Sequence, residues 1–263
     1  MEELAYDRAG SGEPLLLVHA LGSRRGAWKP LVERLRAERE LIAVDMPGFG
    51  DSPPDPAGTR LTVFQHADRL QRFCGELGVE RPHVAGNSTG GAVVLELGRR
   101  GAARSVTAFA PIGFWNRSGI RWCQAALRVG HRAGVRRPRS IPPAIDLFLA
   151  RVGLRIPAFG RPFKVPPQEV LATRAAGLNA PGYRDAVDYT LDYRFEGDPG
   201  ALREIPVTVA WGSRDLLLPA FTQAREARRR LPWARHVSLP RCGHVPFYDD
   251  PDLCARVLLE GSA

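Results

Sequence analysis

The sequence has 263 residues, 44% of them hydrophobic and 25% charged, and a formal net charge of +9 at pH 7. This length allows one large domain with a substantial core, and this composition is typical of a globular protein. No apolar run reaches the roughly 18 residues that span a bilayer, and the acidic, polar start of the chain is not a secretory signal. We therefore expect a soluble, cytoplasmic protein.

Apolar runs of strand length alternate along the chain with segments whose apolar residues recur at helical spacing. Strands are predicted at residues 14–20, 41–46, 83–87, 105–111, 206–211 and 234–240, and helices at residues 28–39, 63–77, 90–100 and 253–259. Asp250 is the predicted N-cap of the last helix, with Pro251 in its first turn. Most strands are nearly continuous in apolar residues, as expected when helices cover both faces. The pattern predicts an α/β fold with a doubly wound, mostly parallel sheet.

About ninety residues between the strands at 105–111 and 206–211 contain helical patterns and many prolines but no convincing strand. A structureless loop of that length would be improbable in a compact domain. We therefore predict a helical subdomain, a cap or lid, at residues 112–205. The core would then consist of residues 1–111 and 206–263.

The positive charge is concentrated in this insertion. Residues 113–164 contain ten arginines, one lysine and a single acid, Asp146, so their net charge is +10 and the rest of the chain sums to −1. The arginines attract either an anionic substrate or a lipid headgroup surface, or they form a solvated face. No nucleic-acid recognition motif accompanies them, so we expect no nucleic-acid partner. Peripheral membrane contact through the cap stays open, as does the oligomeric state.

The cysteines, Cys74, Cys123, Cys242 and Cys254, have neither CxxC nor CxxH spacing. This spacing does not indicate a zinc site, and without a secretory signal disulfides are not expected. We predict four reduced cysteines that pack in the interior. Neither a metal nor a cofactor is expected.

The segment GNSTGG, residues 86–91, places Ser88 between Gly86 and Gly90, where a predicted strand meets a predicted helix. A nucleophile elbow needs this context, because the turn is so tight that side chains two positions away would collide. The helix that follows presents backbone N–H groups to developing negative charge. The alternative is a Gly/Ser turn with no catalytic role.

A nucleophilic serine needs a base and a group that orients the base. His244 is the candidate base, because it is the histidine in a loop after the final strand. The other histidines are expected elsewhere. His19 lies at a strand end, where it bonds the neighbouring loop. His66 lies in a helix, His83 at a strand start, His131 in the insertion and His236 in the last strand.

Asp215 is the candidate acid, because it follows the apolar strand at 206–211, at the edge where catalytic groups gather in open α/β sheets. The other aspartates between Ser88 and His244 have no such strand before them: Asp146, Asp185, Asp188, Asp192 and Asp198. Two N–H groups would form an oxyanion hole, that of Thr89 after the nucleophile and that of Leu21 in the loop after the first parallel strand.

Five motifs in this order, LLLVHALGS followed by a tryptophan, VDMPGFGDS, GNSTGG, GSRD and CGHVPFYDDP, resemble the α/β-hydrolase superfamily over nearly the whole chain. The resemblance implies a triad of Ser88, Asp215 and His244, with Leu21 and Thr89 at the oxyanion hole. The family usually has glycine where this chain has Ala20, and an alanine would be strained there if the position needs a positive φ.

The resemblance also implies a reaction class. Serine at the elbow argues against relatives of haloalkane dehalogenases and epoxide hydrolases, which use aspartate there. The expected activity is hydrolysis of an ester-type bond in a small, largely apolar acyl substrate through an acyl-enzyme. Alternatives are a thioesterase, a C–C bond hydrolase, although Val245 follows His244 where such enzymes often carry tryptophan, or a receptor-like protein with little turnover. Six aromatic residues either line an acyl pocket or pack the cap onto the sheet: Phe114, Trp115, Trp122, Phe148, Phe159 and Phe163.

Overall fold

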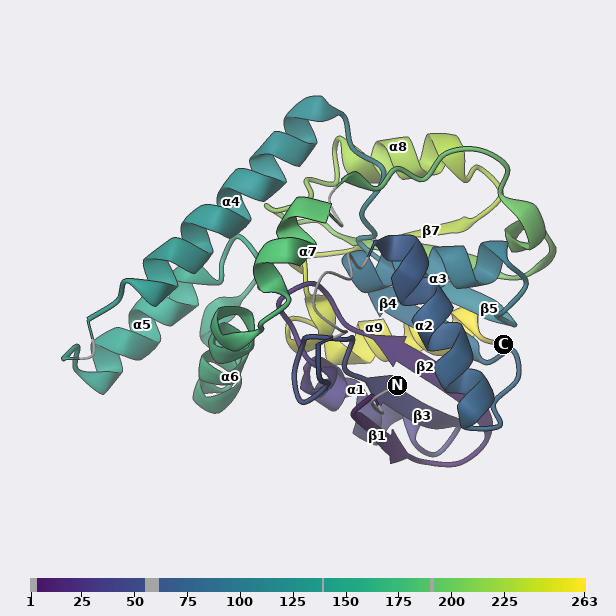
Figure 1. Ribbon diagram of the computed structural model, residues 1–263, viewed down its shortest axis with the longest axis horizontal. Coiled ribbons are helices and arrows are strands. Elements are labelled where there is room, and N and C mark those ends of the chain that lie inside the picture. The colour runs from purple at the N-terminus through teal and green to yellow at the C-terminus, as the bar shows by residue number, and fades with distance from the viewer. Residues whose placement is uncertain (1–3, 55–61, 139, 190–191) are drawn as a thin grey trace.

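The computed structural model describes residues 4–54, 62–138, 140–189 and 192–263 (Figure 1). The strands of this part of the chain form one sheet in the order β1-β3-β2-β4-β5-β6-β7. Their bounds are Tyr6–Ala9 for β1, Glu13–Val18 for β2, Arg39–Val44 for β3, His83–Asn87 for β4, Ser105–Phe109 for β5, Val207–Gly212 for β6 and Arg235–Leu239 for β7. Only β1 is antiparallel to its neighbour among these strands, so the predicted α/β fold with a mostly parallel sheet is confirmed.

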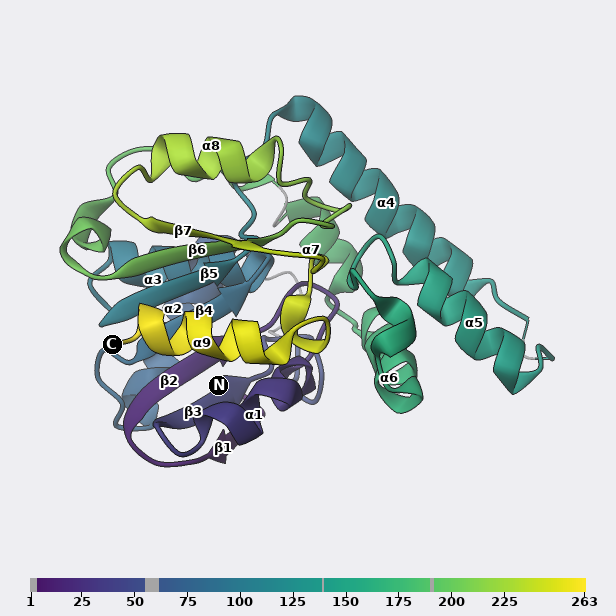
Figure 2. The ribbon, with the colours of Figure 1, turned by 180° about the vertical axis from the view of Figure 1, so that it is seen from behind.

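Helices cover both faces of this sheet. Figure 1 shows α2 (Val63–Glu76) and α3 (Thr89–Arg99) in front of it and α8 (Gln223–Arg230) above β7, and Figure 2 shows α1 (Lys29–Leu35) and α9 (Pro251–Gly261) on the opposite face. Successive strand residues point to opposite faces, so each strand contributes to two apolar layers. In β2, for example, Leu16 belongs to one cluster and Leu17 to the other.

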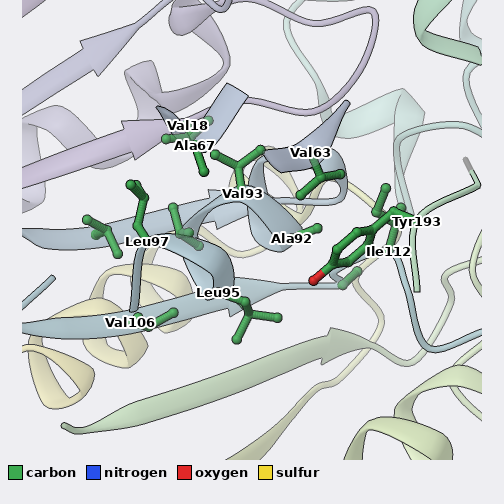
Figure 3. Close-up of a cluster of buried hydrophobic side chains, with 14 of the residues drawn as sticks. Val18, Val63, Ala67, Ala92, Val93, Leu95, Leu97, Val106, Ile112 and Tyr193 are labelled. Carbon is green, nitrogen blue, oxygen red and sulfur yellow. The ribbon is translucent and has the colours of Figure 1, made fainter. Parts of the chain in front are cut away.

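Figure 3 shows part of the layer under α2 and α3. Val18 and Val106 come from two strands and meet Val93 and Leu97 of α3, and all four side chains are almost completely buried. Burial of such side chains contributes roughly 1.5–3 kcal/mol each. This layer fixes α3 against β4 and therefore fixes the turn between them.

The elements differ from the sequence predictions at a few places. The six predicted strands are all present, with ends shifted by up to two residues, and Asp250 caps α9 by accepting the N–H of Leu253 at 3.1 Å. No apolar pattern predicted β1, because its four residues are half-buried or exposed and lie at the sheet edge. Helix α8 was not predicted either, since Ala224 and Ala227 are its only apolar residues.

A helical insertion lies between β5 and β6. It contains α4 (Arg117–Val135), α5 (Pro143–Gly153), α6 (Pro167–Asn179) and α7 (Tyr183–Tyr189). Prolines begin α5 and α6, where a missing N–H costs no hydrogen bond. Figures 1 and 2 both show α4 and α5 projecting well beyond the sheet. No helix within the described ranges is long and apolar enough to cross a membrane. The division at residues 112 and 205 stays a prediction.

Candidate active site

Ser88 connects β4, the middle strand of the sheet, to α3. Its φ of 56° and ψ of −112° are unusual for a residue with a side chain and store strain. Hydrogen bonds hold this conformation: the Ser88 N–H donates to the Phe109 carbonyl at 2.9 Å, and the Ser88 carbonyl accepts from Ala92 and Ile112 at 3.1 Å each. Ser88 therefore lies on a rigid turn at the carboxyl end of the central strand.

Gly86 and Gly90 are required because backbone atoms pass very close to them. A Cβ at Gly86 would lie 2.2 Å from the Gly90 carbonyl oxygen, and a Cβ at Gly90 would lie 2.3 Å from that of Val18. Both distances are far inside van der Waals contact, and the obstacles are backbone atoms that have no rotamer to change. The collision predicted for the residues two positions from Ser88 is therefore confirmed.

His244 and Asp215 form a buried pair. His244 Nδ1 lies 2.8 Å from Asp215 Oδ2, and the two residues are 2% and 4% exposed. The other carboxylate oxygen, Oδ1, accepts the N–H groups of Leu217 at 3.0 Å and Leu218 at 2.8 Å. Because the carboxylate accepts, we assign the proton to Nδ1, which leaves Nε2 as an acceptor.

The Nε2 atom of His244 is buried and has no hydrogen-bond partner among the described residues. A buried acceptor without a partner costs roughly 1–3 kcal/mol. His244 and Ser88 line the same cavity. The structure therefore brings the three residues predicted from sequence into one place and leaves the acceptor nitrogen of His244 without a partner in the part of the chain that it describes.

The cavity has a volume of about 410 Å³ and lies between the sheet and the insertion. This volume is within the range of small-molecule sites. One wall is a face of α4 made of small and apolar residues: Cys123, Ala126, Leu127, Gly130, Ala133 and Gly134. At 1.5 Å per residue, the stretch from Cys123 to Gly134 is about 16 Å long. The cavity is therefore elongated and mainly apolar.

The N–H groups of Leu21 and Thr89 are available to a ligand. Both residues line the cavity beside Ser88, and Thr89 is the first residue of α3, whose N–H has no partner within the helix. Neither N–H has an acceptor within the described part of the chain. Two free donors beside a serine can hold a developing oxyanion.

Ala20 does not carry the strain that its place in the motif suggests. The described residues with a side chain and a positive φ are Arg81, Ser88, Ala110 and Arg241, and Ala20 is not among them. In this loop the positive φ, 70°, falls at Gly22. The backbone beside Leu21 is therefore compatible with alanine.

The remaining histidines have other environments. His19 contacts the Ala20 carbonyl and accepts the Met46 N–H, at 2.7 and 2.9 Å, so its predicted structural role is confirmed. His83 binds the Ser105 hydroxyl and Glu13 at a distance from the cavity. His66 is buried in α2, and His236 contacts the Leu231 carbonyl. His131 lines the cavity but stacks on the Tyr183 ring, with centroids 4.7 Å apart.

Of the six aromatic residues weighed for the pocket, only Phe159 lines the cavity. Phe114 and Trp115 are buried in the core, which bears out packing for these two. Trp122, Phe148 and Phe163 instead have exposures of 45%, 54% and 61%. Phe148 and Phe163 do neither of the two things that the sequence suggested, whereas the indole N–H of Trp122 donates to the Leu216 carbonyl at 2.9 Å and so joins α4 to the loop after β6.

The four cysteines are free and buried, as predicted. Of these four cysteines, Cys123 is the one that lines the cavity. Burial, with a smaller contribution from the Asp215 charge, raises the pKa of Cys123 to about 12. A thiol with this pKa is protonated at neutral pH and is a poor nucleophile. The Cys123 thiol is therefore not a candidate nucleophile.

Asp249 is a residue that sequence reasoning missed. Its Oδ2 accepts the N–H groups of Gly160 and Gly243, and its Oδ1 accepts that of Arg161, each at 2.7 Å. Burial raises the pKa of Asp249, and these three N–H groups oppose that change. Because Gly160 and Arg161 belong to the insertion and Gly243 precedes His244, Asp249 ties the insertion to the loop that carries the histidine.

Comparison with known proteins agrees with this fold. Residues 15–257 match the Alpha/beta hydrolase family, and the chain belongs to that family. It is 32% identical to epoxide hydrolase EphH of Mycobacterium tuberculosis, over 70% of this chain and 87% of that protein. It is also 32% identical to the dihydrolipoyllysine-residue acetyltransferase component of the acetoin cleaving system of Cupriavidus necator, over 57% of this chain but only 38% of that protein.

A solved structure is similar over almost the whole chain. It is a thermophilic esterase from Thermogutta terrifontis, with a TM-score of 0.72 and 25% sequence identity, and the match covers 98% of this chain and 92% of that one. The predicted α/β-hydrolase fold with a helical insertion is thus confirmed, and the protein is a hydrolase of this fold.

Proposed function

We propose that the protein is a serine-dependent carboxylesterase whose nucleophile is Ser88, whose base is His244 and whose orienting acid is Asp215. The observation that carries this proposal is the buried, unpartnered Nε2 of His244, which lines one cavity with Ser88 while Asp215 holds the opposite ring nitrogen. An acceptor in this position can remove the serine proton.

The reaction follows from these positions. His244 Nε2 takes the proton of Ser88 as the serine oxygen attacks the ester carbonyl carbon. The N–H groups of Leu21 and Thr89 stabilise the resulting oxyanion, and the positive end of α3 adds to this. The C–O bond to the alcohol then breaks, and the alcohol leaves with the proton from His244. A water molecule, activated by the same histidine, hydrolyses the acyl-enzyme.

The cavity supports an apolar acyl group as the substrate's main recognition feature. Its α4 wall carries mainly alanine, glycine and leucine, and its length of about 16 Å matches an extended chain better than a compact ring. Serine rather than aspartate at the elbow favours ester chemistry over epoxide opening, although a relative carries the name of an epoxide hydrolase.

The test is a series of p-nitrophenyl esters from acetate to palmitate, measured with the wild type and with Ser88→Ala. We expect the variant to lose activity by roughly 10³-fold or more while its melting temperature stays within a few degrees. Ser118→Ala, at an exposed position on α4, is the matched control and should keep full activity. Near-normal rates in Ser88→Ala would contradict the assignment of the nucleophile. A wild type that hydrolyses no ester, yet is stabilised by one, would instead indicate a binding protein.

A further inference from the structure

Helix α5 exposes an apolar stripe that no described part of the chain covers. Within the helix, Ile145, Phe148, Leu149 and Val152 recur at spacings of three, one and three, so they share one helical face. Their exposures are 52%, 54%, 45% and 50%, and Ile156, which is 37% exposed, follows just beyond the end of the helix. Phe163, which is 61% exposed, extends the stripe, and its ring centroid lies 6.0 Å from that of Phe148.

The opposite side of α5 already has its packing partners. Ala150 is buried, and Leu147 and Leu154 pack against the same cluster. The exposed stripe is therefore additional to the side that holds the helix in place. Ten of the thirteen large hydrophobic residues that the described structure leaves exposed lie in the insertion. Contiguous exposed apolar surface of this kind marks an interaction site in natural proteins.

The surroundings of the stripe are cationic. Arg151 lies over the Phe163 ring at 5.5 Å, and Lys164 is exposed beside it. Arg132 and Arg136 are exposed at the end of α4 that projects with α5 beyond the sheet (Figure 1). Asp146, the single acid between residues 113 and 164, already pairs with Arg137 and Arg174.

This charge distribution indicates which kind of partner the stripe binds. A second copy of the chain would bring an equally cationic surface against the first, and the two would repel each other. An anionic lipid bilayer offers both an apolar interior for the stripe and negative headgroups for the arginines. Arginine and aromatic side chains are also suited to the boundary between headgroups and acyl chains.

The stripe is continuous with the cavity of the candidate active site. Leu149 is one of the exposed residues of the stripe and is also part of the cavity wall. Ala150 and Gly153 of the same helix line the cavity as well. Helix α5 alone therefore separates the cavity from any surface against which the stripe packs.

We propose that the α5 stripe and the arginines around it dock the protein on the surface of an anionic lipid bilayer. The helix lies in the headgroup region, with Phe148, Val152 and Phe163 inserted, and does not span the membrane. Docking does not depend on hydrolysis, so it is measured by binding.

The experiment is sedimentation of the full chain with vesicles of equal parts phosphatidylglycerol and phosphatidylcholine, compared with vesicles of phosphatidylcholine alone. Phe148→Gln/Val152→Gln removes apolar area and should weaken binding at least about tenfold. Arg132→Gln/Arg136→Gln removes two charges and should weaken binding about 30-fold at low salt. Phe221→Gln, at a residue that is 79% exposed outside the insertion, is the matched control and should bind like the wild type.

Each result of this binding experiment either supports the proposed docking or contradicts it. The proposal is supported if the wild type and the control bind strongly to the anionic vesicles and both double variants bind more weakly. High salt should then weaken the binding of the wild type by screening. Equal binding to both kinds of vesicle, or no effect of Phe148→Gln/Val152→Gln, overturns it. A concentration-dependent dimer that this variant dissociates would assign the stripe to a second copy of the chain and also overturn it. Phe148 and Val152 do not line the cavity, so unchanged acetate ester hydrolysis shows that the variant is folded.

Discussion

His244 Nδ1 and Asp215 Oδ2 lie 2.8 Å apart, although 29 positions separate the two residues in the chain. Adjacent parallel strands bring them together, because Asp215 follows β6 and His244 follows β7. Gly212 of β6 is in register with Leu239 of β7, so the two strands end at the same edge of the sheet. The contact therefore depends on a register that the whole sheet fixes.

Asp215→Asn tests what this contact does for the reaction. The amide can still meet Nδ1, but it carries no charge to stabilise the imidazolium and can select the wrong tautomer. We expect kcat for a p-nitrophenyl ester to fall by roughly 10³- to 10⁴-fold, as the corresponding change does in a serine protease, with little change in KM. Asp198→Asn, at an exposed site, is the control. A loss of less than tenfold would mean that Asp215 is only a structural partner of His244.

Gly90→Ala tests the tight packing at the serine turn. The new Cβ would meet the Val18 carbonyl oxygen at 2.3 Å, so we expect a loss of about 3 kcal/mol in the free energy of unfolding, measured with urea. Gly75→Ala is the matched change in α2, where a Cβ would meet no described atom within 4 Å. It should stabilise the protein by up to about 1 kcal/mol. Equal effects in the two variants would show that close backbone approach does not constrain residue 90.

Gly130→Phe tests the elongated cavity. Gly130 lines the α4 wall, and a Cβ there would have open space around it. A benzyl group should fill the part of the cavity remote from Ser88. The ratio of kcat/KM for palmitate to that for acetate esters should therefore fall at least about tenfold, while acetate turnover changes little. If both esters lose activity equally, the acyl chain does not run along α4.

Acid should destabilise the protein through His66. Burial lowers the pKa of His66 from 6.5 to about 4, so below pH 6.5 the unfolded chain binds a proton that the folded protein refuses. The contribution of neutral His66 to the free energy of unfolding is therefore fully present above pH 6.5. It decreases by roughly 3 kcal/mol as the pH falls toward 4. Burial lowers the pKa of His19 as well, which adds an effect of the same sign.

Urea unfolding of the wild type and of His66→Leu across this pH range measures the effect. The variant should lose less stability between neutral and acid pH, with the remaining slope coming from His19 and the carboxylates. Identical slopes for the two proteins would show that His66 is not neutral in the folded state.

Local signals in the sequence were sufficient for much of this molecule. Ser88 could be predicted because its neighbours are glycines, a strand precedes it and a helix follows, and the structure bears out each of these features. Asp215 and His244 could be predicted because each follows a predicted strand, and parallel strands end at one edge. These predictions needed only neighbouring residues and one rule of sheet topology.

Contacts between distant segments could not be read in this way. Asp249 stands directly before the predicted N-cap Asp250, and nothing near it in the sequence indicates that it accepts N–H groups from the insertion, such as that of Arg161, 88 positions away. Strand β1 could not be predicted either, because its residues carry no apolar pattern. The small residues of α4 have a spacing typical of any helix, which does not indicate that they line a cavity.

The sequence alone therefore determined the α/β class, the turn at Ser88 and the order of the three candidate catalytic residues, because local spacing dictates backbone conformation and strand ends. Only the tertiary structure decided which α4 residues form the cavity, that Phe159 alone of six aromatic residues enters it, and that the α5 stripe stays exposed. Those facts depend on how helices far apart in the chain pack against one another, and helical periodicity shows that a face is apolar without showing what covers it.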